Sequence, residues 1–295
     1  MKTIVWQLVK RNLLRYWRDK GALIFSLLSV MIVVILNILF LADMQIQHIK
    51  TNFLDTAGID ELVYGFVLGG LLCIPAVSVP IMLLTFKVDD AVQGTQDDLL
   101  VTPVSRHLIM LGYVIAAWIA GFVMTMLTFV IGEVFISAGG GQLLSFVSIL
   151  RVIGIVSLTI LVFSVFSFFV IMRLRSNSAL TVVNTILNTM IGFLAGLYIP
   201  VGFLSAGISD VIKSFPLFHA AALLRQIFMQ TPIDRVFGNA PAQVVDRIRQ
   251  DYGANIVIGG HAFQGWEMYL FLIGFGIVFF AGSALMLTKY KRRNV

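Results

Sequence analysis

The sequence predicts an all-α protein that crosses a membrane six times. Hydrophobic residues make up 59% of the 295-residue chain, charged residues only 12%, and the mean hydropathy is +0.95. Soluble proteins carry about 25% charged residues, so this composition excludes a soluble domain. The apolar residues occur in long uncharged runs, and an α-helix needs about 20 such residues to cross a bilayer. The single cysteine, Cys73, excludes an intramolecular disulfide and a thiolate metal site.

Six runs meet this length requirement. They are residues 21–42, 62–86, 108–132, 152–172, 179–204 and 266–288. The second run contains Pro75 and Pro80. A proline inside a helix lacks the backbone donor for the preceding turn, so this run is expected to be kinked. The runs and the segments between them are interpreted as one transmembrane domain, residues 1–295.

The first 20 residues predict an amphipathic helix that lies in the membrane interface. Apolar side chains recur there at helical spacing, at Val5, Val9, Leu13 and Tyr16. Basic side chains occupy another face, as in helices that bind at the headgroup level. A solvated basic tail is the alternative. Far along the chain, residues 205–265 form the largest polar segment, and Ala240–Tyr252 within it again has the pattern of an amphipathic helix.

The distribution of lysine and arginine predicts the topology. These residues concentrate in segments 1–20, 87–106, 173–175 and 289–293, which six spans place on one side. Positive residues favour the cytoplasmic side, so both termini and residues 87–106 are expected in the cytoplasm. The same pattern explains the net charge of +6, since the basic residues flank apolar runs and do not form the basic, aromatic-rich face that binds nucleic acid.

Residues 87–106 are the only strongly polar interruption in the first half of the chain. They contain four aspartates and the helix-stopping pair Thr102-Pro103. The composition predicts one short helix, or two half-turns, lying flat on the membrane surface. Its length suits a docking element better than a turn.

This polar stretch resembles the cytoplasmic coupling loop of ABC-2 type permeases, the membrane subunits of ABC exporters. The resemblance is carried by Lys87-Val-Asp-Asp, Gly94-Thr95, Asp98-Leu99-Leu100 and Val101-Thr102-Pro103-Val104-Ser105-Arg106. A second likeness follows the fifth run, where Phe215-Pro216 and Arg225 match an Asn-Pro…Arg pattern of a re-entrant helix pair. The chain departs from the family in Phe215, and in having lysine, aspartate and glutamine where the first half of the loop often has arginine and glutamate.

The resemblance implies a set of partners and of contact residues. It implies two copies of a separate ATPase that holds Mg-ATP, a second permease copy or related half, surrounding membrane lipids, and a place in the bacterial cytoplasmic membrane. It also implies that the ATPase docks on Asp89, Asp90, Gly94, Thr95, Asp98, Leu99 and Pro103. The chain itself would need no cofactor and would not be an enzyme.

The energy source is expected to lie outside this chain. The sequence has no GxxxxGK[ST] motif, so it lacks a P-loop nucleotide site. A gradient-driven carrier would need an ionisable group at membrane depth. Glu133 comes nearest, but the run before it already spans the bilayer, so Glu133 is expected at the outer interface. The four histidines are scattered without metal-ligand spacing.

One face of the fifth run predicts either the translocation path or a helix contact. Its polar residues are spaced at i, i+3, i+4 and i+7, and they are Thr181, Asn184, Thr185 and Asn188. Amide and hydroxyl groups in hydrocarbon need partners, which a hydrated cavity, another helix or a dimer interface would supply. By the resemblance, Phe66, Asn184, Thr185 and Asn188 would line the path at the dimer axis.

The cargo and the class of transporter stay open, with three alternatives to the favoured interpretation. The mostly apolar spans favour hydrophobic or amphipathic cargo, such as a drug, lipid or peptide. Export of a polysaccharide or cell-envelope precursor is the alternative within the same family. A gradient-driven transporter and a non-transporting sensor are the alternatives outside it, and the short inner loops offer no signalling domain for a sensor.

Overall fold

The computed structural model describes residues 2–36, 42–52, 58–94, 104–174 and 176–292. Within them the chain is a bundle of long helices, which confirms the predicted all-α class; a two-stranded hairpin is the strand structure among these residues. The first half comprises α1 (Lys2–Arg18), α2 (Lys20–Leu36), α3 (Ala42–Asn52), α4 (Ile59–Leu71), α5 (Cys73–Val92) and α7 (Arg106–Ala138). The second half comprises α8 (Phe146–Ile171), α9 (Asn177–Leu194), the 3-10 turn η2 (Val201–Phe203), α10 (Ala206–Lys213), α11 (Pro216–Phe228), α12 (Gln230–Phe237), α13 (Ala242–Asp251), β1 (Val257–Ile258), β2 (His261–Ala262) and α14 (Gly265–Arg292).

Four of the predicted spans are confirmed by length and composition. Among the described residues, the helical runs long and apolar enough to cross a membrane are Ile59–Val92, Arg106–Ala138, Phe146–Ile171 and Gly265–Thr288. The other two predicted spans correspond to α2 and α9, which have 17 and 18 residues. Part of the first predicted span, residues 37–41, lies outside the described residues. The count of six spans therefore stays a prediction.

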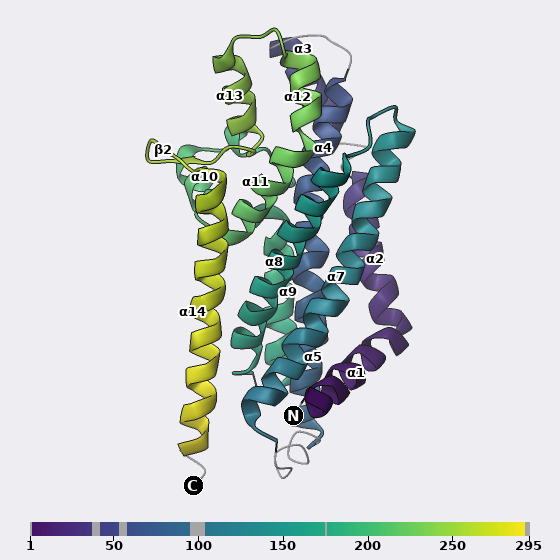
Figure 1. Ribbon diagram of the computed structural model, residues 1–295, viewed down its shortest axis with the longest axis vertical. Coiled ribbons are helices and arrows are strands. Elements are labelled where there is room, and N and C mark those ends of the chain that lie inside the picture. Colours follow the sequence, from purple (N-terminus) through teal and green to yellow (C-terminus); the bar gives the residue numbers. More distant parts are fainter. Residues whose placement is uncertain (1, 37–41, 53–57, 95–103, 175, 293–295) are drawn as a thin grey trace.

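The two ends of the bundle differ. Figure 1 shows that the start of α1, the end of α5, the start of α7 and the end of α14 lie at one end, which we call the terminal end. The opposite end carries α12, α13 and the β1–β2 hairpin, which we call the cap. Gly259 and Gly260 between the two strands both have positive φ, at 58° and 83°. A two-residue hairpin turn needs this geometry, and glycine adopts it without strain.

The second predicted span is an interrupted helix. Its helical run stops briefly at Leu72, between α4 and α5. Pro75 cannot donate a hydrogen bond to the carbonyl of Leu71, which explains the break at this position. Pro80 lies further along, inside α5. The interruption therefore lies near the first of the two prolines, and the kink itself stays a prediction.

The apolar core divides within α4, about one turn before the interruption. Leu68, Leu71 and the residues of α5 belong to a large core shared with α7, α8, α9 and α11. Ile59, Leu62 and Phe66 belong instead to a smaller core that α4 forms with α3, α12 and α13. The two halves of one predicted span thus pack in different surroundings.

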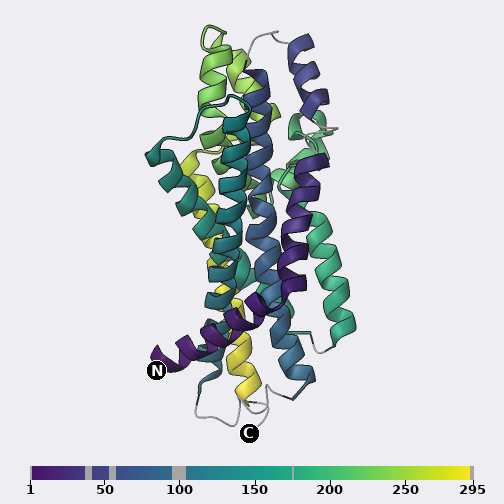
Figure 2. The same ribbon diagram turned by 90° about the vertical axis from the view of Figure 1, so that its right-hand side faces the viewer.

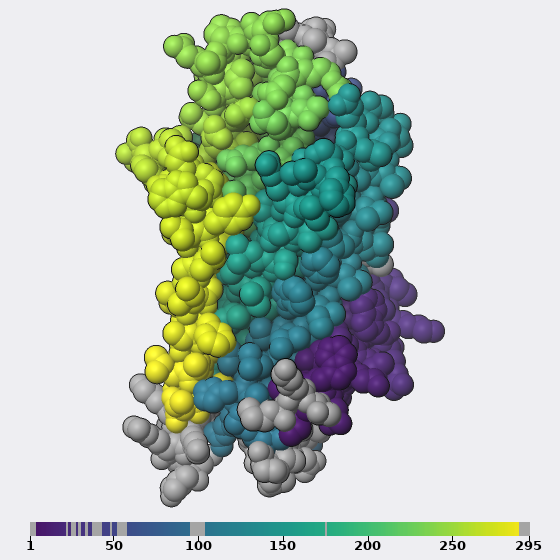
Figure 3. Space-filling view, in the orientation of Figure 1, coloured from purple at the N-terminus to yellow at the C-terminus, as the bar shows by residue number. Residues whose placement is uncertain are grey.

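The remaining helices cover this core. The α1 helix crosses the terminal end obliquely and packs on α7, where Leu8 lies against Gly112, so the solvated-tail alternative does not hold (Figure 1). In Figure 3 α14 forms an outer ridge, consistent with its packing on α8 and α11. Figure 2 shows α9 at one side of the bundle beside α5, its main neighbour. The predicted amphipathic helix Ala240–Tyr252 is α13.

Candidate functional site

Charged residues from α1 and α5 meet a tyrosine of α7 at the terminal end, next to the stretch that resembles a coupling loop. One oxygen of Asp90, in the last turns of α5, lies 2.6 Å from Nη2 of Arg11. Its other oxygen lies 2.9 Å from Nη1 of Arg15. The hydroxyl of Tyr113 on α7 donates to Asp90 and accepts from Nη2 of Arg11 at 2.9 Å. These contacts fasten α1 and α7 to the end of α5.

The network balances its own charge. Asp90 is buried, at 4% exposure, and a buried carboxylate is costly unless it is paired and hydrogen-bonded. Two guanidinium groups and a hydroxyl supply those partners. Burial alone would lower the pKa of Arg11, but Tyr113 and Asp90 outweigh it and raise that pKa, so Arg11 stays charged. Arg15 also lies over the ring of Phe86, with 4.3 Å between its guanidinium carbon and the ring centre.

Two neighbouring residues extend these attachments. Asp89 accepts from Nη2 of Arg15 at 3.2 Å, with 28% of its side chain exposed. Lys87 donates from Nζ to the carbonyl of Met172 at 3.1 Å. Since Met172 caps the end of α8, the end of α5 is joined to α8 as well as to α1 and α7. A displacement of this end would act on four helices together.

The predicted coupling loop, residues 87–106, is shorter in the structure than in the sequence interpretation. The α5 helix continues to Val92, because the charges of its last turns are satisfied by α1 and α8. Gly94 is exposed, has φ of 77° and has no atom near the position of a Cβ. The other predicted docking residues, Thr95, Asp98, Leu99 and Pro103, lie outside the described residues. Ser105 caps α7 by accepting from the backbone of Leu108.

The predicted pathway residues lie in two separate places. Phe66 is fully buried in α4, where its ring meets that of Tyr252 edge to face at 5.3 Å. Thr185 and Asn188 are instead exposed on α9, and Asn184 is half-buried. Their hydrogen bonds stay within that helix: Nδ2 of Asn188 donates to the carbonyl of Asn184 at 2.8 Å, and Thr185 donates to the carbonyl of Thr181 at 2.9 Å. The structure does not bring Phe66 and the α9 face together.

A comparison with known families agrees with the resemblance carried by residues 87–106. A family model described as "ABC-2 family transporter protein" matches residues 37–285. The chain belongs to the ABC-2 transporter family. It is therefore a multi-pass membrane protein and the membrane subunit of an ABC transporter, and this membership implies pairing with an ABC ATPase. The sequence matches none of the curated proteins with which it was compared.

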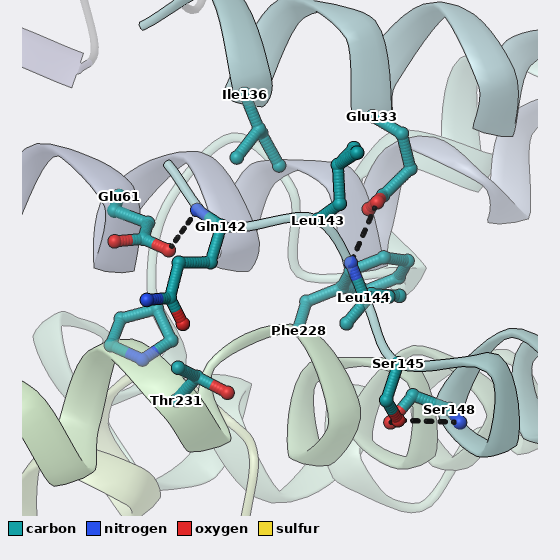
Figure 4. A pocket seen from close by; sticks show the side chains of 11 residues that line it. Glu61, Glu133, Ile136, Gln142, Leu143, Leu144, Ser145, Ser148, Phe228 and Thr231 are labelled. Carbon is teal, nitrogen blue, oxygen red and sulfur yellow. Dashed lines mark hydrogen bonds between the residues drawn. The ribbon is translucent and has the colours of Figure 1, made fainter. Parts of the chain in front are cut away.

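Two carboxylates of the permease organise the α7–α8 connection at the cap end. Figure 4 shows Glu133 and Glu61 on either side of a cavity of about 80 Å³. An oxygen of Glu133 accepts from the backbone of Leu144 at 3.2 Å, and an oxygen of Glu61 accepts from the backbone of Gln142 at 3.0 Å. Glu61 also pairs with Arg235 of α12 at 2.6 Å. Glu133 thus fixes a loop backbone near the end of α7.

Sequence reasoning missed the network of this ABC-2 permease because its partners are far apart in the chain. Arg11 and Asp90 are separated by 79 positions, and Asp90 and Tyr113 by 23. One signal was available: Arg11 and Arg15 are four residues apart and therefore share a face of the predicted first helix. In the described part of the chain, no group of three or more His, Cys, Asp or Glu side chains could hold a metal ion.

Proposed function

We propose that this permease forms the export pathway for hydrophobic or amphipathic cargo, such as a drug, lipid or peptide, driven by two copies of a separate ATPase that holds Mg-ATP. A second copy of the permease, or a related half, completes the pathway. The observation that carries the proposal is the charged network at the terminal end, which joins the helix leading into the coupling stretch to α1, α7 and α8.

The network suggests how the motor would act on the pathway. The ATPase would dock on Gly94, Thr95, Asp98, Leu99 and Pro103, in the stretch between α5 and α7. Because Asp90 is buried among arginines, it would act as a positioning residue, with Asp89 beside it. A push on the coupling stretch would then move the attached ends of the four helices as one unit, so closure of the ATPase dimer would shift the pathway from inward-open to outward-open.

The exposed polar face of α9 is the proposed wall of the pathway. Thr185, Asn188 and the half-buried Asn184 have hydrogen bonds only within their own helix among the described residues. Two such faces, one from each permease copy, would enclose a path with a few polar groups in apolar surroundings, which suits amphipathic cargo. Phe66, fully buried in α4, packs in the smaller core and would not touch cargo.

The docking role is tested by reversing charge and polarity in the coupling stretch. In Asp98→Lys with Leu99→Asp, we expect the ATPase to be lost from the purified complex and ATP-driven transport to be abolished, with membrane insertion unchanged. Asp210→Lys is the matched control, since Asp210 is an exposed acid on α10, away from the terminal end. Co-purification of the ATPase with the double variant at the wild-type ratio would refute the docking role.

The gradient-driven alternative is tested with the same preparation. It requires cargo movement in proteoliposomes that contain the permease, an ion gradient and no ATPase. It also requires that Glu133→Gln stop this movement. The proposed function instead expects no movement without ATPase and ATP, and it expects Glu133→Gln to retain transport because glutamine also offers an oxygen to the backbone of Leu144. Competition with labelled drug, lipid, peptide and glycan precursors would identify the cargo class.

A further inference from the structure

The connection between α7 and α8 projects from the side of the bundle. It runs from residue 139 to residue 145 and leads into the first turns of α8, and we call residues 139–151 the elbow. In Figure 2 the elbow, in teal, leaves α7 at the cap end, runs sideways and back toward the terminal end, and then turns into α8. The first turns of α8 therefore lie beside the bundle and not on top of it.

The outward face of the elbow is apolar. Phe146, Val147 and Leu150 are 73%, 58% and 51% exposed, and their spacing places them on one face of α8. Ser148 lies on the other side of this helix and lines the small cavity beside Glu133. A cluster of exposed apolar side chains, unlike a single one, marks contact with a partner or with a membrane.

The inner face of the elbow is held by polar contacts. Glu61 of α4 and Glu133 of α7 accept hydrogen bonds from two of its backbone N–H groups (Figure 4). Ser145 caps α8 by accepting from the backbone of Ser148 at 3.2 Å. The apolar face is thus presented on a backbone that is tied to two other helices.

The apolar face continues the outer surface of α7. Val130, Ile131 and Val134 are exposed near the end of that helix, which is one of the candidate spans. Exposed apolar side chains of a membrane span face lipid. Because the chain passes directly from this surface into the elbow, the bilayer would cover both.

An arginine relates the elbow to the lipid headgroups. Arg151 is exposed, lies four residues after Val147 on the same face of α8, and forms no ion pair within the described part of the chain. A charge in a span is costly in hydrocarbon, but a long side chain can extend to the polar edge of the bilayer. The start of α8 therefore suits the interface between acyl chains and headgroups.

Trp266 marks a similar depth on the neighbouring helix. α8 and α14 run in the same direction, and a Cβ added at Gly276 would lie 3.1 Å from Cγ2 of Val162. Counted back from this contact, Arg151 and Trp266 lie eleven and ten residues earlier in their helices. Each residue of a helix rises by about 1.5 Å, so the two lie at similar depth. Trp266 is 63% exposed, and exposed tryptophan is typical of the headgroup level.

We infer that the elbow inserts into the interfacial region of the leaflet at the cap end, with Phe146, Val147 and Leu150 against the lipid and Arg151 at the level of the phosphates. The connection between these two spans would then be a membrane contact and not an aqueous loop, and it would fix the depth of α7 and α8 in the bilayer. The inference concerns the permease alone and does not depend on its cargo or on the ATPase.

The test measures the depth of a spin label on the elbow by electron paramagnetic resonance. The label is attached to Val147→Cys in the full-length permease, with the buried Cys73 replaced by serine so that one thiol reacts. The protein is reconstituted in vesicles of phosphatidylcholine and phosphatidylglycerol. Oxygen concentrates in the bilayer and a nickel chelate stays in water, so the ratio of their collision rates with the label reports depth.

Two other labelled positions calibrate the ratio. Gln243→Cys, at an exposed position of α13 in the cap, is the aqueous control, and Val130→Cys, on the outer surface of α7, is the control for the bilayer interior. We expect the oxygen-to-nickel ratio at Val147 to exceed that at Gln243 severalfold and to stay below that at Val130. Phe146→Cys, the adjacent residue of the same face, should give the same result if Val147→Cys does not fold.

Two outcomes would overturn the inference. A ratio at Val147 equal to that at Gln243 would place the elbow in water. A label that neither oxygen nor the nickel chelate reaches would show that protein covers this face, as a second copy of the permease would.

Discussion

The two ends of the permease hold arginines in opposite ways. At the terminal end, Arg11 and Arg15 share the carboxylate of Asp90, and Asp89 supplies the second negative charge that balances the two arginines. At the cap end, Arg225 is more deeply buried and is held by backbone carbonyls. The first arrangement ties together helices that are remote in sequence. The second anchors the end of α9 to α11 through a guanidinium that also lies over the ring of Phe66.

The comparison predicts that the terminal end is the more sensitive to loss of one charge. Asp90→Ala would remove the carboxylate partner of Arg11 and the acceptor of the Tyr113 hydroxyl, and it would leave Arg15 with Asp89 alone. We expect the free energy of unfolding to fall by about 2–3 kcal/mol, less than for a fully buried pair because each arginine side chain is 34% exposed. Thermal or denaturant unfolding of the purified protein measures this loss.

Asp89→Ala is the control for this prediction. Asp89 is the adjacent acid and is 28% exposed, and its ion pair with Arg15 is longer, at 3.2 Å. Loss of this ion pair should lower the free energy of unfolding by less than about 1 kcal/mol. Equal costs for the two variants would show that burial of Asp90 does not determine the strength of the network.

At the cap end, Arg225→Met should lower the free energy of unfolding less than Asp90→Ala does. The variant removes hydrogen bonds to the carbonyls of Ala195 and Gly196, but it also removes a buried charge that has no counter-ion among the described residues. We expect a net loss of about 1–2 kcal/mol, measured in the same unfolding experiment. A loss larger than that of Asp90→Ala would reverse the comparison between the two ends.

The smallest effect on stability is expected on α9, between the two ends. Asn188→Leu should change the free energy of unfolding by less than about 0.5 kcal/mol, since Asn188 is exposed and its hydrogen bonds run within its own helix. If this face lines the pathway, the variant should still alter cargo-stimulated ATPase activity of the reconstituted complex. Ile186→Leu, at an exposed apolar position on another face of α9, is the control.

The outcome of Asn188→Leu also separates the two interpretations of the α9 face. A changed response to cargo with an unchanged dimer supports a pathway wall. A weaker or stronger dimer, measured by light scattering, with normal cargo stimulation per complex supports a packing surface instead.

The sequence predicted what depends on composition and local pattern. Long uncharged runs marked four spans close to their observed bounds, and the spacing of apolar residues marked α1 and α13. Helix lengths were underestimated where polar residues continue a span, as at Lys87–Val92 and after Gly132. In both places tertiary partners satisfy the polar groups: Arg11 and Arg15 for Asp90, and the backbone of Leu144 for Glu133.

Local pattern could not predict which residues would share a site. Phe66 was grouped with the α9 residues by resemblance, yet it packs with Tyr252, 186 positions away in the sequence, in the smaller core. Arg225 was noticed only as part of an Asn-Pro…Arg likeness. Its burial depends on the carbonyls of Ala195 and Gly196 at the end of α9 and on glycines from two other segments, Gly69 and Gly70 of α4 and Gly253 after α13, and no short window of sequence contains them.

The interruption at Leu72 makes a weak point in the long central helix formed by α4 and α5. On the terminal side, α5 packs in the large core together with Leu68 and Leu71 of α4, and on the other side the first turns of α4 pack in the smaller core with the cap. A proline-weakened turn bends at lower cost than an unbroken helix, because one backbone hydrogen bond is already missing. A displacement of the end of α5 at Val92 would therefore bend the helix near Leu72. The cap would then keep its conformation while the terminal end moves.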